Sequence, residues 1–90
     1  MVMEFSLLTG ERVRITVNAD KVKMTRMQMM IFPYLIMGYS DPEIARVLGT
    51  SPHTIKIHRS KIRANLGIQN VRRMAIKGLA RNLFTLEILR

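Results

Sequence analysis

Apolar and polar residues alternate near the start of the chain, in the segment MEFSLLTGERVRITV. Val13, Ile15 and Val17 are separated by polar residues, which is the period-two pattern of a half-buried strand. Gly10 supplies a turn before this run. The pattern therefore predicts a β-hairpin over residues 3–17. Because an isolated two-stranded hairpin is marginally stable in water, it must pack on the helical part or on another chain.

The apolar period then changes to that of a helix, which we expect over residues 24–37, with a kink at Pro33. This helix is apolar on all sides, so another surface must cover it. Its second apolar face, beyond the side needed for a core, holds Met29, Phe32 and Ile36. Two interpretations stay open. Either the hairpin of the same chain fills a core here, or the methionine-rich surface docks another protein.

A helix start signal follows in the segment SDPE. Ser40 can cap a helix, Glu43 can reach back to the cap, and proline is tolerated in the first turn. A second helix is therefore predicted over residues 41–48, ending at Gly49.

Two more helices follow. Ser51 stands directly before a proline, and Gly67 lies where a left-handed C-terminal residue is expected, so a third helix is predicted over residues 52–66. Asn70 can cap a fourth helix over residues 71–82. The apolar stripe of the fourth helix consists of Val71, Met74, Ala75, Gly78 and Leu79.

The second and third helices have the spacing of a helix-turn-helix. Ala45 permits close approach, Gly49 can adopt the left-handed conformation, and Ile55 can anchor the following helix. The predicted fold is mainly α, with four helices preceded by a short N-terminal β-hairpin. We expect a hairpin extension at residues 1–23, a helix-turn-helix domain at residues 24–82 and a C-terminal tail at residues 83–90.

The net charge and its distribution along the chain indicate the kind of partner. The chain has 15 Lys and Arg against 6 Asp and Glu, a net charge of +9. Residues 51–82 contain eight of these basic residues and no acidic one. Such a segment favours nucleic acid, an anionic membrane or an acidic protein as partner. The plainer interpretation is a solvated basic face.

The predicted third helix divides into two faces at about 100° per residue. Its core face holds Ile55, Ile62 and Leu66. The opposite face holds His53, Lys56, Ser60 and Arg63, with Ile57 and Ala64 beside them. Cations that attract phosphates, next to donors for base edges and an apolar group for a thymine methyl, suit the DNA major groove. At the helix start, Ser51 and Thr54 can donate to a phosphate.

The sequence offers little for catalysis or for a cofactor. His53 and His58 lie about 140° apart on the predicted helix, so they do not chelate one metal readily, and no cysteine is present. There is no glycine-rich phosphate loop. We therefore expect no enzyme, no metal and no cofactor.

The expected location is the cytoplasm, in association with the nucleoid. No apolar run reaches the roughly 18 residues of a membrane span, and the start lacks a signal-peptide pattern. A role on a membrane surface is disfavoured because the basic residues do not lie opposite a continuous apolar face.

Residues 24–82 resemble the LuxR/GerE-type helix-turn-helix domain of bacterial transcription regulators. The likeness is strongest in GYSDPEIARVLGTSPHTIKIHRSKIRANLGIQN, which follows the family's pattern of G, S, EIA, L, S, HTVK, H and LG without a gap. The resemblance implies four helices, with the third in the major groove and the fourth often pairing two subunits. It also implies that Lys56, Ile57 and Ser60 face base edges. Near the DNA backbone it places Ser51, Thr54, His58 and Lys61. Arg59 and Arg63 complete the candidate DNA-binding residues.

Departures from the family leave a second function open. The segment TRMQMMIFP is more apolar than the family's usual first helix, and Lys61 replaces a common asparagine. The leading hypothesis is a homodimeric regulator that binds double-stranded DNA and is controlled by its abundance or by a partner. The alternative is a small adaptor or antagonist that binds another regulator or RNA polymerase, since GYSDPEIARVLGTS also resembles the promoter-binding region of sigma factors.

Overall fold

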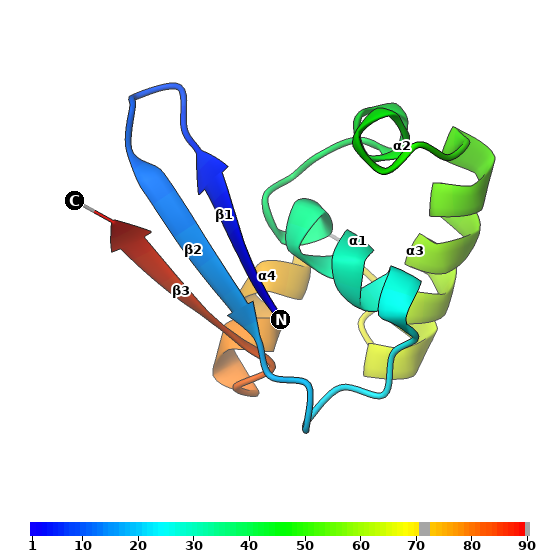
Figure 1. The fold of residues 1–90 in the computed structure, drawn as a ribbon. Coiled ribbons are helices and arrows are strands. Elements are labelled where there is room, and N and C mark those ends of the chain that lie inside the picture. The colour runs from blue at the N-terminus through cyan, green and yellow to red at the C-terminus, as the bar shows by residue number, and fades with distance from the viewer. Residues whose placement is uncertain (71–72, 90) are drawn as a thin grey trace.

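The computed structural model describes residues 1–70 and 73–89. In chain order the elements are β1 (Val2–Ser6), β2 (Arg12–Val17), α1 (Arg26–Ile36), α2 (Asp41–Leu48), α3 (Pro52–Leu66), α4 (Met74–Ala80) and β3 (Phe84–Leu89). Figure 1 shows the sheet on one side, α1 in the middle, and α2 with α3 on the far side. The mainly helical fold with an N-terminal hairpin is thereby confirmed. Over the described residues, no helix combines the length and apolarity needed to cross a membrane.

The three strands form one antiparallel sheet in the order β1-β2-β3. One face turns its apolar side chains toward the helices, and Val13, Ile15 and Val17 of the central strand are buried there. Phe5 on β1 packs edge-on against Tyr34 of α1, with ring centroids 5.2 Å apart. The hairpin is therefore stabilised by the helical layer, as its marginal intrinsic stability requires.

The C-terminal residues correct the predicted tail. Residues 84–89 form β3, which pairs with β2 from Val17↔Phe84 to Arg12↔Leu89. Phe84 is buried, and its ring lies edge-on to Phe32 at 5.9 Å. The prediction failed because β3 gains its hydrogen bonds from a strand more than sixty residues earlier, a pairing that no local pattern indicates.

Helix α1 is apolar all round because it is covered on both sides. It contacts β2 on one side and α3 on the other, and Ile31, Phe32 and Leu35 are buried. Its start is a capping box in which Thr25 accepts from the Gln28 backbone N–H at 3.2 Å and the Gln28 side chain accepts from Thr25 N–H. The helix continues through Pro33 to residue 36.

Helices α2 and α3 have the predicted bounds and caps. Ser40 and Ser51 are the N-caps, while Gly49 and Gly67 end the helices with φ of +69° and +65°. The left-handed conformation is accessible to glycine at little cost, so the two glycines fix where each helix stops.

Helix α4 spans Met74–Ala80 and ends two residues before the predicted end at 82, while the predicted start at 71 lies outside the described residues. Its end is a left-handed turn at Asn82, φ +57°, where Leu83 N–H donates to Gly78 C=O at 2.9 Å. Gly78 lies against the Phe84 ring. A larger residue does not fit there without a shift of the ring, because a Cβ at this position would approach Phe84 Cε1 to 2.5 Å. This turn directs the chain straight into β3.

The capping box at Ser40 predicts a pH effect. Glu43 accepts from Ser40 N–H at 2.9 Å, and this backbone bond, together with the bond to the Ser40 hydroxyl, lowers the pKa of Glu43 from 4.5. A lowered folded-state pKa stabilises the protein above the unfolded-state pKa, and this contribution is lost as the pH falls through the folded-state value.

We therefore expect Glu43→Gln to lower the free energy of unfolding at neutral pH and to have a progressively smaller effect below about pH 4. Urea unfolding of both proteins over a pH series measures this difference. A difference that stays constant with pH would contradict the assignment.

Candidate nucleic-acid interface

The α2–α3 pair is a compact helix-turn-helix. Gly49 and Thr50 form the turn, and Thr50 N–H donates to Ala45 C=O at 3.0 Å. Ala45 and Ile55 are buried where the two helices pack. The small side chain permits close approach of the helices, and the isoleucine fills the space beneath the turn. This packing fixes the orientation of α3 relative to the rest of the fold.

The N-terminus of α3 begins at an exposed cap. Ser51 Oγ accepts from Thr54 N–H at 3.2 Å, and the two side-chain hydroxyls lie 2.9 Å apart. The first-turn N–H groups and the positive end of the helix dipole therefore lie at the surface. This is the geometry in which a helix start binds a phosphate.

The predicted DNA-contacting residues divide by exposure. The exposed group contains Ser51, His53, Lys56, Ile57, Ser60 and Lys61. The half-buried group contains Thr54, His58, Arg59 and Arg63. All the exposed members lie on α3 or at its cap, and Figure 1 shows α3 on the side of α1 away from the sheet. One continuous polar and basic face results.

Two lysines on this face are available to a ligand. Among the described residues, the side chains of Lys56 and Lys61 form no hydrogen bond or ion pair. Ile57 lies between them in sequence and is 43% exposed. An exposed isoleucine beside unpaired cations has no role in the core of this chain, which favours a contact role.

Arg59 differs from these lysines because it pairs within the protein. Its Nη2 lies 3.2 Å from Asp41 Oδ2, joining α3 to the first turn of α2. Both side chains are less than one third exposed. Arg59 therefore orients α3 within the helix-turn-helix, and its partner Asp41 was not identified from the sequence.

A double-mutant cycle on Asp41→Asn and Arg59→Gln is expected to give a coupling energy of about 1 kcal/mol in the free energy of unfolding. The partial burial of the pair places it at the upper end of exposed ion pairs. Chemical denaturation of the four proteins provides the measurement. Effects that add with no coupling would show that the pair does not stabilise the helix-turn-helix.

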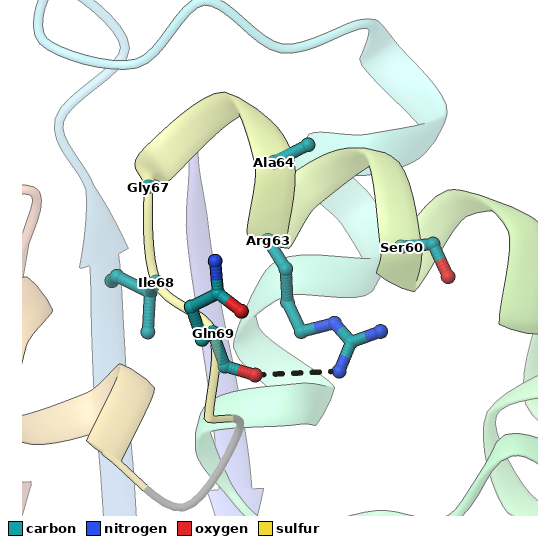
Figure 2. Close-up of a pocket in the computed structure, with 6 residues that line it drawn as sticks. All are labelled: Ser60, Arg63, Ala64, Gly67, Ile68 and Gln69. Atoms are coloured by element: carbon teal, nitrogen blue, oxygen red, sulfur yellow. Dashed lines mark hydrogen bonds between the residues drawn. The ribbon is translucent and has the colours of Figure 1, made fainter.

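The C-terminal half of α3 borders a cavity of about 280 Å³ (Figure 2). Arg63 Nη1 donates to Gln69 C=O at 3.4 Å, and Arg81 Nη1 donates to Leu66 C=O at 2.6 Å. The cavity is lined by Ser60, Arg63, Ala64, Gly67, Ile68 and Gln69. These two hydrogen bonds were not predicted from the sequence, because the proximity of Gln69 and Arg81 to α3 depends on the path of the chain after Gly67.

The residues predicted for a dimer or partner interface are mostly internal. Phe32, Met74 and Gly78 are buried in this chain's own core, which corrects their prediction as surface contacts. Met29, Ile36 and Ala75 are half-buried against that core. Leu79 is exposed, and Ile76, which the predicted stripe omitted, is exposed beside it. Val71 lies outside the described residues.

Comparison with known proteins agrees with this geometry. A family profile described as GerE, bacterial regulatory proteins, luxR family, matches residues 22–77. The chain is similar in structure to the crystal structure of the phage VqmA-DPO complex, with a TM-score of 0.58 and 16% sequence identity. The alignment covers 99% of this chain but 61% of that one, and at this identity the likeness concerns the fold alone. No curated protein matches the sequence.

Proposed function

Because the chain belongs to the luxR family of bacterial regulatory proteins, we propose that it regulates transcription by inserting α3 into the major groove of double-stranded DNA. The observation that carries the proposal is the exposed face of α3, which holds unpaired cations and no acidic residue. A basic helix of about this width fits the major groove of B-form DNA. The family consists of DNA-binding regulators rather than enzymes.

The side chains take different roles in this proposal. Lys56 donates to base edges, most favourably to guanine O6 and N7, while Ile57 contacts a thymine methyl and Ser60 adds a short polar contact. The exposed cap at Ser51 and the lysine at position 61 bind phosphates and set the register of the helix. Arg59 acts indirectly, through its ion pair with α2.

We also propose that two copies bind together, since regulators of this architecture read paired half-sites. The resemblance assigns the contact between copies to the fourth helix. In this chain, Met74 and Gly78 are core residues, so the surface that α4 offers consists of the exposed Ile76, Leu79 and Ala80, with Ala75 and Lys77 half-buried beside them.

The adaptor function has less support. It rested on an apolar surface at the first helix, yet Phe32 is buried, and Met29 and Ile36 pack against the chain's own core. The exposed face of α3 has no equivalent explanation in that hypothesis, so DNA binding is the better proposal.

Selection of bound duplexes from a random DNA pool, followed by titration of the most enriched duplex at several salt concentrations, tests the proposed function. We expect an enriched motif and an affinity that falls steeply with salt as phosphates are neutralised. Weak binding with no enriched motif, by protein verified as folded, would overturn sequence-specific recognition.

A further inference from the structure

The outer side of β3, here called the β3 edge (residues 84–88), has backbone groups that the sheet does not use. Asn18 N–H donates to Leu83 C=O at 2.8 Å, so this position is a hydrogen-bonded pair between β2 and β3. Such pairs alternate along an antiparallel ladder. It follows that Thr85 and Glu87 bond to β2, whereas the N–H and C=O groups of Phe84, Leu86 and Ile88 point away from the sheet.

The hydrogen bonds between β2 and β1 follow the same alternation. Val17 N–H donates to Met1 C=O at 2.7 Å, so the odd-numbered residues of β2 bond to β1 and the even-numbered ones to β3. The hydrogen-bond patterns on both sides of β2 therefore agree that the backbone N–H and C=O groups of Phe84, Leu86 and Ile88 point away from the sheet.

Two apolar side chains at this edge, Leu86 and Ile88, are partly exposed to solvent. Leu86 and Ile88 lie on the helix-facing side of the sheet, opposite Ile15 and Val13, which are buried. Leu86 is nevertheless 41% exposed and Ile88 50% exposed. Natural edge strands are usually protected by charged side chains, proline or a bulge. Over its paired length β3 has no proline and no bulge, and Glu87 is its one charged residue.

We propose that a second copy of this chain pairs with the β3 edge and closes a continuous six-stranded sheet. The sequence of β3 fits itself in an antiparallel register centred on Leu86. That register pairs Phe84 with Ile88 of the other copy through the outward backbone groups, each pair exchanging two hydrogen bonds. On the polar face it sets Glu87 opposite Thr85 rather than opposite another carboxylate.

Alternative pairings are less favourable. Moving the register by one pair to centre on Glu87 opposes two carboxylates, which is destabilising. The β1 edge has the same problem at its centre, where Glu4 would oppose Glu4 of the second copy. Pairing β1 with β3 of another copy is a head-to-tail contact, which gives rings or open chains rather than a two-fold dimer.

The β3 pairing also suits DNA binding, although the pairing itself does not depend on the proposed function. Because Leu86 faces Leu86 on the same side of the sheet, the two-fold axis is perpendicular to the sheet. In Figure 1, α3 lies on the side of α1 away from the sheet. Both α3 helices therefore face the same way, as symmetric half-sites require. A strand edge with two partly exposed apolar side chains buries a small area, so we expect weak, concentration-dependent dimerisation.

Sedimentation of the 90-residue protein over a concentration series tests the pairing. We expect the mass to rise from monomer to dimer for the native chain and to remain monomeric for Leu86→Pro. This substitution removes an outward N–H that β2 does not use, and proline is tolerated on an edge of this kind. Leu79→Lys, on the exposed face of α4, is the matched control and should still dimerise. Circular dichroism verifies that each variant is folded.

Disulfide formation tests the register independently, because the chain has no native cysteine. Mixing Thr85→Cys protein with Glu87→Cys protein should give a cross-linked heterodimer under mild oxidation, while each variant alone cross-links poorly. A chain that is monomeric throughout and gives no cross-link would overturn the proposal. A dimer that survives Leu86→Pro but dissociates in Leu79→Lys would overturn it in favour of α4. The DNA selection reports separately, since a monomer can still enrich a single half-site.

Discussion

Replacing Phe84 with alanine is expected to lower the free energy of unfolding by about 3–5 kcal/mol, the range for removing a large aromatic side chain from a core. Phe84 is 1% exposed and packs edge-on against Phe32 of α1, with ring centroids 5.9 Å apart. The same ring covers the Gly78 backbone. One side chain thus joins β3, α1 and α4, and its removal leaves a cavity where the three meet.

Urea denaturation at neutral pH measures this loss, with Thr85→Ala as the control. Thr85 is the next residue on the strand and is exposed, so its truncation should change the free energy of unfolding by less than about 0.5 kcal/mol. Since small domains have limited stability, Phe84→Ala could leave a large unfolded fraction even without urea. Equal, small effects of the two substitutions would show that β3 is dispensable for the fold.

The second large effect is expected at the proposed DNA interface. Lys56→Ala should weaken binding to the selected duplex by about 1–3 kcal/mol, which is roughly 5- to 150-fold, and should relax preference at one base pair. The reason is that Lys56 is exposed on α3, and no described residue pairs with its ammonium group. Titration of the most enriched duplex and of its single-base variants provides the measurement.

Lys61→Ala is the matched control, because it removes another exposed lysine from the same helix. If Lys61 binds a phosphate, the substitution should weaken all sequences about equally and reduce the magnitude of the salt slope by about one. Should Lys56→Ala also weaken every duplex to the same extent, Lys56 would be a phosphate contact and the proposed base readout would be incorrect.

Local signals in the sequence were sufficient for the helix-turn-helix. Ser40 and Ser51 start α2 and α3, and Gly49 and Gly67 end them, each by a hydrogen bond or a backbone conformation confined to neighbouring residues. A second capping box, between Thr25 and Gln28, carried the same kind of signal but was not recognised, so the start of α1 was placed two residues too early, and its end was placed one residue too late.

Other features depended on residues distant in sequence. The apolar stripe assigned to α4 marks a core face, because Met74 is buried in this chain's own core and Gly78 lies against Phe84 of β3. Periodicity identifies an apolar face but not the surface that covers it. Likewise, nothing near Arg59 in the sequence distinguishes it from the neighbouring cations, although Asp41 holds it in place.

The sequence by itself determined the bounds of α2 and α3, the face of α3 that carries the cations, and the resemblance to a family of regulators, because caps, turns and helical period act over a few residues. Only the tertiary structure decided that residues 84–89 complete the sheet, that the core encloses Phe32 and Met74, and that an open strand edge lies opposite the helix-turn-helix. These features arise from contacts that form only when the two ends of the chain meet, and such long-range pairing leaves no pattern within either segment alone.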